Sequence, residues 1–266
     1  MRIAVCIKQV PDTAEVRLDP KTNNLIRDGV PSIINHDDKS GLEAAISLRD
    51  ELNDGSTVTV VCMGPPQADV ALREALAMGA DEAYLVSARE FGGSDTYATA
   101  TIVGAALDKV GYDLVITGRQ AIDGDTAQVG PQIAEQLDLP QVTYAEELKY
   151  IKEENALIVR RQFEDKAHMV KIKLPCLVTA LAELAEPRYM KVGKIVDAYN
   201  HEVKVLGFDD LKDILNPDWI GNAGSPTNVV KSFTKPAKTA GVLLKDLTVD
   251  QAVEAIMAKL IERHLI

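Results

Sequence analysis

Several residue types that mark particular protein classes are scarce in this chain of 266 residues. Cysteine occurs only as Cys6, Cys62 and Cys176, and no two of them form a CxxC pair, which argues against an iron–sulfur cluster or structural zinc within this chain. Aromatic residues make up 5%, so the core must be built mainly from Ala, Val, Leu and Ile. No window approaches the ~20 apolar residues of a membrane span. The apolar run that opens the chain is too short for a signal peptide. We therefore expect a cytoplasmic protein in a reducing compartment.

Positive charge is also in the minority. Lys and Arg number 29 against 40 Asp and Glu, which gives a net charge of −11. Such a surface repels phosphate backbones and anionic lipid, so neither nucleic acid nor a membrane is expected as a partner. The composition fits a protein that meets other proteins and holds a nucleotide through backbone amides.

Short apolar runs alternate with helical patterns in the first half of the chain. Residues 2–9, 57–63, 83–86 and 114–118 are predicted strands, and 40–52, 68–78 and 95–109 are predicted helices. The spacing of Ser40 and Glu43 is typical of a capping box, which places the start of that helix at residues 38–40. A hairpin is predicted at residues 15–28. Alternating strands and helices predict a Rossmann-like α/β fold, a mostly parallel sheet with helices on both faces.

The pattern changes in the second half. Residues 148–152, 156–163 and 167–173 are predicted antiparallel strands, and 176–182 a further buried strand. After residue 206 the chain is rich in turn residues, which predicts an extended arm. Thr248 and Gln251 form a second capping box before a terminal helix with an apolar stripe. We predict a nucleotide-binding domain at residues 1–205, and an arm with a terminal helix at 206–266. That helix packs either on its own domain or on a partner subunit.

The candidate binding segment is TGRQAIDGDTAQVGP at residues 117–131, between a strand and a helix predicted at 132–137. Open α/β sheets bind ligands at the carboxyl ends of their strands, and a helix start favours phosphate. Gly124 would let backbone approach a pyrophosphate, and Thr126 and Gln128 can add hydrogen bonds. The carboxylates of Asp123 and Asp125 are expected to cap backbone amides or face ribose hydroxyls. From the residues alone, a capped helix start is an equally good interpretation. No P-loop or GxGxxG motif is present.

The chain resembles the electron-transferring flavoprotein beta family along nearly its whole length. The matching segments are VCIKQVPD at 5–12, DGV at 28–30 followed by Asn35, CMGP at 62–65, AMGAD at 77–81, RRQFE at 160–164, KLP at 173–175 with VTA at 178–180, and EPRY at 186–189. Any one of these is a weak signal, but their shared order and spacing make a chance match improbable. The resemblance implies an α/β fold of the adenine-nucleotide alpha-hydrolase type, and an arm and terminal helix that embrace a larger alpha subunit with its own FAD.

The resemblance also implies the positions of the nucleotide site. Carried over by position, the cofactor-binding residues are Cys6, Asn35, His36, Asp37, Asp38, Met63, Asp123, Gly124, Asp125, Thr126, Ala127, Gln128, Val129 and Gly130. The segment from Gly93 to Thr99 also resembles members that bifurcate electrons. In this segment the resemblance implies that Asp95 and Thr96 face a flavin. The simpler interpretation is that Ser94 or Asp95 caps a helix.

Two family readings remain open on these residues. The loop resembles that of the bifurcating members, in which this subunit's FAD takes a hydride from NADH. One electron then goes to ferredoxin and the other, through the alpha-subunit FAD, to a flavin-dependent dehydrogenase of the acyl-CoA or lactate type. The alternative is a simple electron carrier that holds AMP at this site. An alternative of another class is an ATP-binding stress or signalling protein of related fold.

The chain departs from the family pattern at three positions. Thr13 and Asp37 stand where family members often place aromatic residues near the partner's flavin. Val192, followed by Gly193, stands where the docking loop normally presents a leucine to the dehydrogenase. The smaller side chain indicates a different dehydrogenase partner or docking mode.

Overall fold

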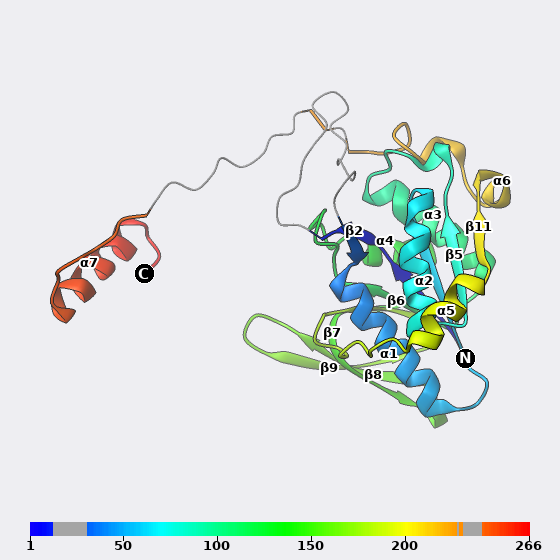
Figure 1. Ribbon diagram of the computed structural model, residues 1–266, viewed down its shortest axis with the longest axis horizontal. Helices are drawn as coiled ribbons and strands as arrows, with labels where there is room; N and C mark the ends of the chain where they lie inside the picture. Colours follow the sequence, from blue (N-terminus) through cyan, green and yellow to red (C-terminus); the bar gives the residue numbers. More distant parts are fainter. Residues whose placement is uncertain (13–30, 228, 231–240) are drawn as a thin grey trace. The chain divides into compact units, whose positions relative to one another are not determined.

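The structure, a computed structural model, describes residues 1–12, 31–227, 229–230 and 241–266 (Figure 1). The chain divides into two compact units, Met1–Val230 and Lys231–Ile266. The hairpin predicted at residues 15–28 and the family position Thr13 lie outside the described residues. Within the described part of the chain, no helix has the length and apolar character needed to cross a membrane.

A nine-stranded sheet forms the centre of the first unit, with the order β11-β5-β4-β1-β6-β10-β7-β8-β9. The strands from β11 to β7 in this order run parallel, and β8 and β9 are added antiparallel. The strands are β1 (Arg2–Ile7), β4 (Thr57–Met63), β5 (Glu82–Val86), β6 (Leu114–Gly118), β7 (Gln141–Ile151), β8 (Ala156–Gln162), β9 (Ala167–Lys173), β10 (Cys176–Ala180) and β11 (Val203–Leu206). A separate antiparallel pair, β2 (Gln9–Pro11) and β3 (Ser32–Ile34), leads from β1 to the first helix.

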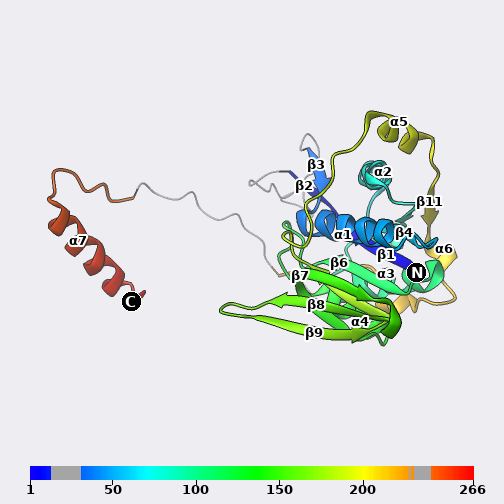
Figure 2. The same cartoon turned by 90° about the horizontal axis from the view of Figure 1, so that it is seen from below.

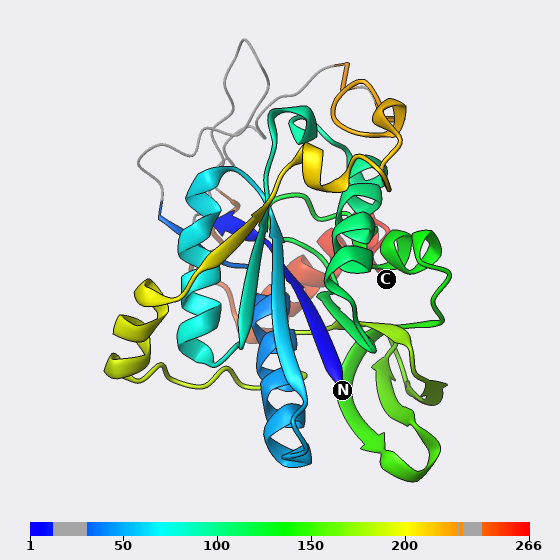
Figure 3. The ribbon, with the colours of Figure 1, turned by 90° about the vertical axis from the view of Figure 1, so that its right-hand side faces the viewer.

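Two layers of helices cover the two faces of the sheet (Figure 2). One layer holds α1 (His36–Leu52), α2 (Asp69–Met78) and α5 (Val192–Asn200), and the other holds α3 (Thr96–Val110), α4 (Val129–Gln136) and α6 (Phe208–Leu211). Because side chains alternate along a strand, Ile3 and Val5 of β1 join the first core and Ala4 joins the second. Figure 3 shows β1, in dark blue, running between the two layers. The predicted α/β class, with helices on both faces of a mostly parallel sheet, is confirmed.

Short 3-10 helices complete the connections, namely η1 (Pro66–Ala68), η2 (Arg89–Phe91), η3 (Lys152–Glu154) and η4 (Pro217–Trp219). The predicted strands and helices of the first half are present with bounds close to those expected. The start of α1 is an exception, because the helix begins at His36 and the predicted capping box at Ser40 is wrong. The Ser40 hydroxyl instead accepts a hydrogen bond from the Ala185 amide, and Glu43 binds Arg188.

The second half holds three features that the sequence pattern did not indicate. β7 begins at Gln141, pairs parallel with β10 at its start, and pairs antiparallel with β8 further along. The helix α5 and the edge strand β11 follow the antiparallel strands. Beyond them Leu211, Leu215 and Ile220 are buried in the core. The first unit therefore runs to Val230, past the predicted boundary at residue 205.

The strand order places a topological switch at the centre of the sheet. After β1 the chain builds β4 and then β5 on one side, and it returns to lay β6 on the other side of β1. Connections that leave β1 and β6 in opposite directions open a crevice at the carboxyl ends of these two strands. The loop between β6 and α4 lies at this edge.

The described part of the second unit contains α7 (Val249–Glu262). Thr248 caps its first turn, and the predicted capping box with Gln251 is confirmed. Its apolar residues are exposed, with Val249 at 80% and Ile261 at 58% of full accessibility.

Candidate functional site

Two buried side chains at the start of α1 tie together the carboxyl ends of β1 and β6. One carboxylate oxygen of Asp38 accepts hydrogen bonds from the Gly118 amide at 3.0 Å and from Asn35 Nδ2 at 3.1 Å. The other accepts a hydrogen bond from the Lys8 amide at 2.7 Å. Asn35 also donates to the Gln120 carbonyl at 2.9 Å and accepts from the Ile122 amide at 3.1 Å. These bonds fix the first residues of the β6–α4 loop over the switch point.

Burial dominates the electrostatics of this cluster. It raises the pKa of Asp38 to about 7, although the hydrogen bonds from Asn35, Lys8 and Gly118 favour the ionised form. Burial also raises the pKa of the Cys6 thiol, and the Asp38 carboxylate adds to this effect. The Cys6 thiol is therefore protonated at neutral pH and is a poor nucleophile.

The loop itself presents backbone amides. Ala127 has a left-handed conformation, with φ 53°, and Gln128 follows in the right-handed region. Successive residues of opposite hand form an anion-binding concavity of N–H groups. Among the described residues, the amides of residues 126–130 meet no acceptor, and no side chain caps α4. The loop therefore directs unpaired donors and the positive end of a helix toward one place.

The two loop carboxylates are engaged by side chains. Asp123 accepts a hydrogen bond from Lys8 Nζ at 2.7 Å, and Asp125 accepts one from Gln120 Nε2. Neither caps a backbone amide among the described residues, so that expectation is wrong, while the alternative that they face ribose hydroxyls stays a prediction. The Lys8 ammonium offsets the charge of Asp123, whereas the neutral Gln120 amide leaves Asp125 its negative charge. The Lys8 ammonium also lies 4.0 Å from the position that a Cβ on Gly124 would take.

The glycines around the loop serve different purposes. A Cβ on Gly118 would overlap the Asp38 carboxylate, and one on Gly130 would lie 2.6 Å from Thr117 Oγ1, so both allow close packing. Gly124 has neither a crowded Cβ position nor a left-handed backbone. The left-handed residues of the loop are Asp125 and Ala127. Neither the backbone conformation nor the packing of the described residues therefore requires glycine at 124.

The remaining predicted site residues lie at the same edge of the sheet. Cys6 is near the end of β1, in register with Val61 of β4 and Thr117 of β6, and Met63 ends β4. His36 is exposed at the first position of α1. Val129 and Gly130 begin α4. The structure thus brings all the predicted positions to the carboxyl ends of β1, β4 and β6.

Asp37 has a partner that the sequence did not reveal. It is 8% exposed, and its Oδ2 lies 3.3 Å from Nε of Arg119, the residue directly after β6. Burial raises the pKa of Asp37, and the Arg119 guanidinium opposes that rise. The sequence did contain one signal for Arg119, because it is a charged residue directly after a predicted central strand.

The start of α3 closes the site on the side of β5. Asp95 caps α3 by accepting from the Ala98 amide at 3.0 Å, and it also accepts from the Thr227 amide at 2.9 Å. The predicted capping role is confirmed. Thr96 Oγ1 donates to Gln128 Oε1 at 2.9 Å and so joins α3 to the loop before α4.

Fold and site together define an open α/β protein with a polar, amide-rich loop at its topological switch point. The model of the electron transfer flavoprotein domain matches residues 22–210. The chain belongs to the electron transfer flavoprotein family.

Relatives of the same length support this assignment. The chain is 54% identical to the electron transfer flavoprotein subunit beta of Thermoanaerobacterium thermosaccharolyticum, over 100% of both chains. It is 52% identical to the caffeyl-CoA reductase-Etf complex subunit CarD of Acetobacterium woodii, again over 100% of both. Protein FixA of Azotobacter vinelandii is 42% identical over 99% of this chain and 96% of its own. The alternative class, an ATP-binding stress or signalling protein, is not what these likenesses favour.

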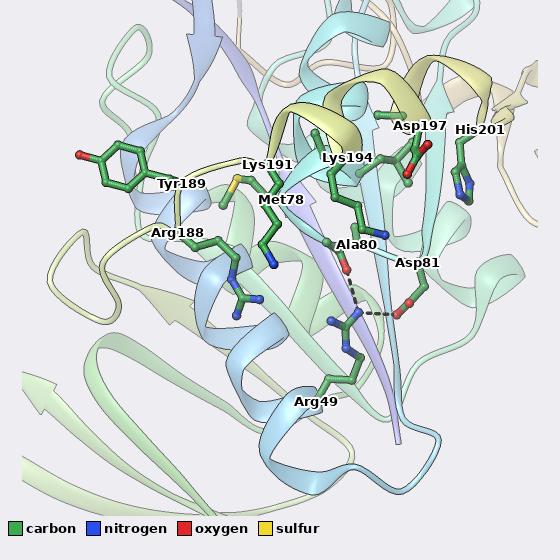
Figure 4. A pocket seen from close by; sticks show the side chains of 14 residues that line it. Arg49, Met78, Ala80, Asp81, Arg188, Tyr189, Lys191, Lys194, Asp197 and His201 are labelled. Carbon is green, nitrogen blue, oxygen red and sulfur yellow. Dashed lines mark hydrogen bonds and ion pairs between the residues drawn. The ribbon is translucent and has the colours of Figure 1, made fainter.

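A second polar feature lies away from the switch point, along α1. Arg188 donates to the Glu43 carboxylate through Nε and Nη2, at 2.9 Å each, and through Nη1 to Asp50 at 3.0 Å. Burial alone would raise the pKa of Glu43, but its hydrogen bonds with Arg188 hold that pKa below the ordinary value. This cluster fastens the segment before α5 to α1. Beside it, α1, α2, α5 and the segment before α5 line a half-open cavity of about 410 Å³ (Figure 4).

Proposed function

We propose that this chain is the beta subunit of an electron-bifurcating electron transfer flavoprotein, with FAD at the carboxyl ends of β1, β4 and β6. The observation that carries the proposal is the loop of residues 119–128, which Asn35 and Asp38 fix over the switch point. Its amides at residues 126–130 have no acceptor in the part of the chain that the structure describes. A diphosphate is the cofactor group that such a loop suits.

The residues around the loop divide the work of binding. The amides from Thr126 to Gly130 would hold the diphosphate, and the Lys8 ammonium, which pairs with Asp123, would lie beside it at Gly124. Thr96 and Gln128, which bond each other at 2.9 Å, offer polar contacts on the side of α3. The half-buried ends of β1 and β4 at Cys6 and Met63 would shield the cofactor from water.

When bound, the flavin supplies the hydride acceptance from NADH and the one-electron chemistry of the complex. One electron would pass to ferredoxin and the other, through the FAD of an alpha subunit, to a flavin-dependent dehydrogenase of the acyl-CoA or lactate type. The likeness to a subunit of a caffeyl-CoA reductase-Etf complex supports a partner that acts on an acyl-CoA. Val192, at the start of α5 and 78% exposed, is suited to contact that partner.

The alternative within the family is a simple carrier that holds AMP. The loop amides suit a monophosphate as well as a diphosphate, so the cofactor itself must be identified. The heterodimer, purified after co-expression, is denatured and its nucleotides are quantified. Two FAD per heterodimer, with NADH-driven reduction of ferredoxin, is the expected result. One FAD and one AMP would contradict the bifurcating role.

A further inference from the structure

The cavity between α1, α2 and α5 lies far along α1 from the nucleotide loop. α1 begins at the carboxyl edge of the sheet, and the residues that line the cavity come from its last turn, from the end of α2 and from α5. The volume of about 410 Å³ falls in the range of small-molecule sites, about 300–1,000 Å³. Part of the lining is apolar, formed by Leu76, Ala77, Met78 and Ala198.

Four cationic side chains surround this apolar surface. Arg49 comes from α1, Arg188 and Lys191 from the segment before α5, and Lys194 from α5 itself. Figure 4 shows Lys191 and Lys194 extending their ammonium groups from the α5 side toward the guanidinium of Arg49. Asp81 and Asp197 also line the cavity, so its lining holds these four cations and two acids.

The two arginines are held in place by acids. Arg49 bonds Asp50 at 2.7 Å and Asp81 at 2.9 Å, and its Nη1 also donates to the Gly79 carbonyl at the end of α2. Arg188 is held by Glu43 and Asp50. These pairs fix the guanidinium groups, and the Gly79 bond offsets the negative end of α2.

The two lysines are different. Neither Lys191 nor Lys194 forms an ion pair with any residue that the structure describes, and Asp197 is the acid on the same helix that lines the cavity. α5 begins at Val192, between the two lysines, and no side chain caps its first turn. Two unpaired ammonium groups and the positive end of a helix thus face one cavity with an apolar side.

We propose that this cavity binds an organic phosphate, with the phosphate or diphosphate group at Lys191 and Lys194 and the apolar body against Leu76, Met78 and Ala198. Lysine binds phosphate as a point charge, and the fixed guanidinium groups add positive potential behind it. Such a ligand would join α5 to α1 and α2. It would thereby steady the helix that exposes Val192 and Val196. This site is separate from the nucleotide loop and goes beyond the proposed cofactor role.

The test uses the intact heterodimer, with its own nucleotides bound, titrated calorimetrically with inorganic phosphate, ADP and adenosine. ADP and phosphate should bind saturably, and adenosine at least tenfold more weakly than ADP. Lys191→Gln combined with Lys194→Gln should weaken ADP binding at least tenfold. The matched control is Lys212→Gln, because Lys212 is exposed and pairs with Asp209 outside the cavity. That control should bind ADP as the wild type does.

A second variant separates this site from the cofactor site. The heterodimer with Gly124→Val, which alters the nucleotide loop, should keep the lysine-dependent ADP binding whether or not it retains FAD. No saturable binding of phosphate or ADP, or equal ADP binding with and without the two lysines, would overturn the inference. Loss of ADP binding in Gly124→Val together with its persistence in the double lysine variant would also overturn it, while leaving the loop site supported.

Discussion

Asp38 is the residue on which the geometry of the carboxyl edge depends most. Its two oxygens accept from Lys8 of the segment after β1, from Gly118 at the end of β6, and from Asn35 before α1. Three donors from three segments therefore share one carboxylate. The resemblance that named Asp38 as a cofactor residue implied contact with a ligand, whereas the structure uses both oxygens within the protein. Its support of the site is through the loop that it positions.

Gly118→Ala tests this role, because the added methyl group would overlap Asp38 Oδ1 and would also press on Asp37 Cβ and the Asp38 amide nitrogen, at 2.9 Å each. A displaced carboxylate leaves buried N–H groups unpaired, at about 1–3 kcal/mol each. We expect the free energy of unfolding, measured by chemical denaturation, to fall by about 2 kcal/mol or more. Gly124→Ala is the control, since its methyl group meets open space, and it should change stability by less than about 0.5 kcal/mol. Equal effects of the two substitutions would refute the role of Asp38.

The pH dependence of stability gives a second test of the same residue. Burial raises the pKa of Asp38 from 3.8 to about 7, and it raises that of Asp37 as well. Between about pH 4 and pH 7 the folded state holds a proton that the unfolded state has released, so the free energy of unfolding falls as pH rises. Asp38→Asn should make this fall shallower in denaturation curves recorded across the window. An unchanged slope would show that Asp38 does not titrate within this pH window.

Helix α1 positions two parts of the molecule, the switch point at its start and the segment from Ala185 to α5 further along. The N-terminal turn of α1 carries Asn35 and Asp38 at the switch point, while Ser40, Glu43 and Asp50 hold the chain before α5. Glu43 is buried, with 7% of its side chain exposed, and Arg188 is its cation. This ion pair fastens the segment before α5, while Arg73 of α2 holds α5 itself through the Ala198 carbonyl at 2.8 Å.

Arg188→Ala should destabilise the protein by about 2 kcal/mol, because it leaves the buried Glu43 carboxylate without its charged donor. It should also speed amide exchange between residues 185 and 201, measured by hydrogen–deuterium exchange. Arg160→Ala is a fair comparison, since Arg160 pairs with Glu146 and Glu147 on the surface and should cost less than about 1 kcal/mol. If residues 185–201 exchange at the wild-type rate, Arg188 does not fasten them.

The elements that the sequence predicted are those with sustained apolar runs or helical apolar patterns. β6 is buried along its whole length, and β1, β4 and α3 are buried at most positions, so their bounds could be read from the residues. The start of α1 could not, because the spacing of Ser40 and Glu43 imitates a capping box while both side chains bond residues 145 positions later. The sequence did not predict α5, because Ala198 is the one residue of this helix that is buried. Its other apolar residues lie on the surface and do not form a core-facing pattern. The ion pair between Asp123 and Lys8 could not be predicted either, because it joins residues that are 115 positions apart in the sequence.

The whole molecule consists of a unit that buries its own core and a second unit whose described residues, 241–266, bury none of their side chains. Met1–Val230 contains both cores, and the described residues of α7 expose Val253, Ile256 and Met257 on the second unit. Exposed apolar stripes of this kind mark interaction surfaces. The predicted role of the arm and helix in binding an alpha subunit remains a prediction that truncation can test.

A chain that ends at Val230 should fold with a thermal transition close to that of the full chain but should not co-purify with the alpha subunit. The cut belongs at 230, since Ser225 and Thr227 bond Asp95 at the start of α3 and their removal would disturb the first unit. Full recovery of heterodimer with the truncated chain would mean that the arm is dispensable.

The central claim, that the loop before α4 holds a flavin in this subunit, is tested most directly by counting flavin in Gly124→Val. We expect the fold to stay intact, because a Cβ at this position meets only the Lys8 ammonium, at 4.0 Å. Gly193→Val, at another uncrowded glycine, is the control. Flavin per heterodimer after gel filtration should be about one for Gly124→Val, with no NADH-driven ferredoxin reduction, and about two for the wild type and Gly193→Val. Two tightly held flavins in the Gly124→Val heterodimer would contradict the account and leave this loop as the uncapped start of a helix.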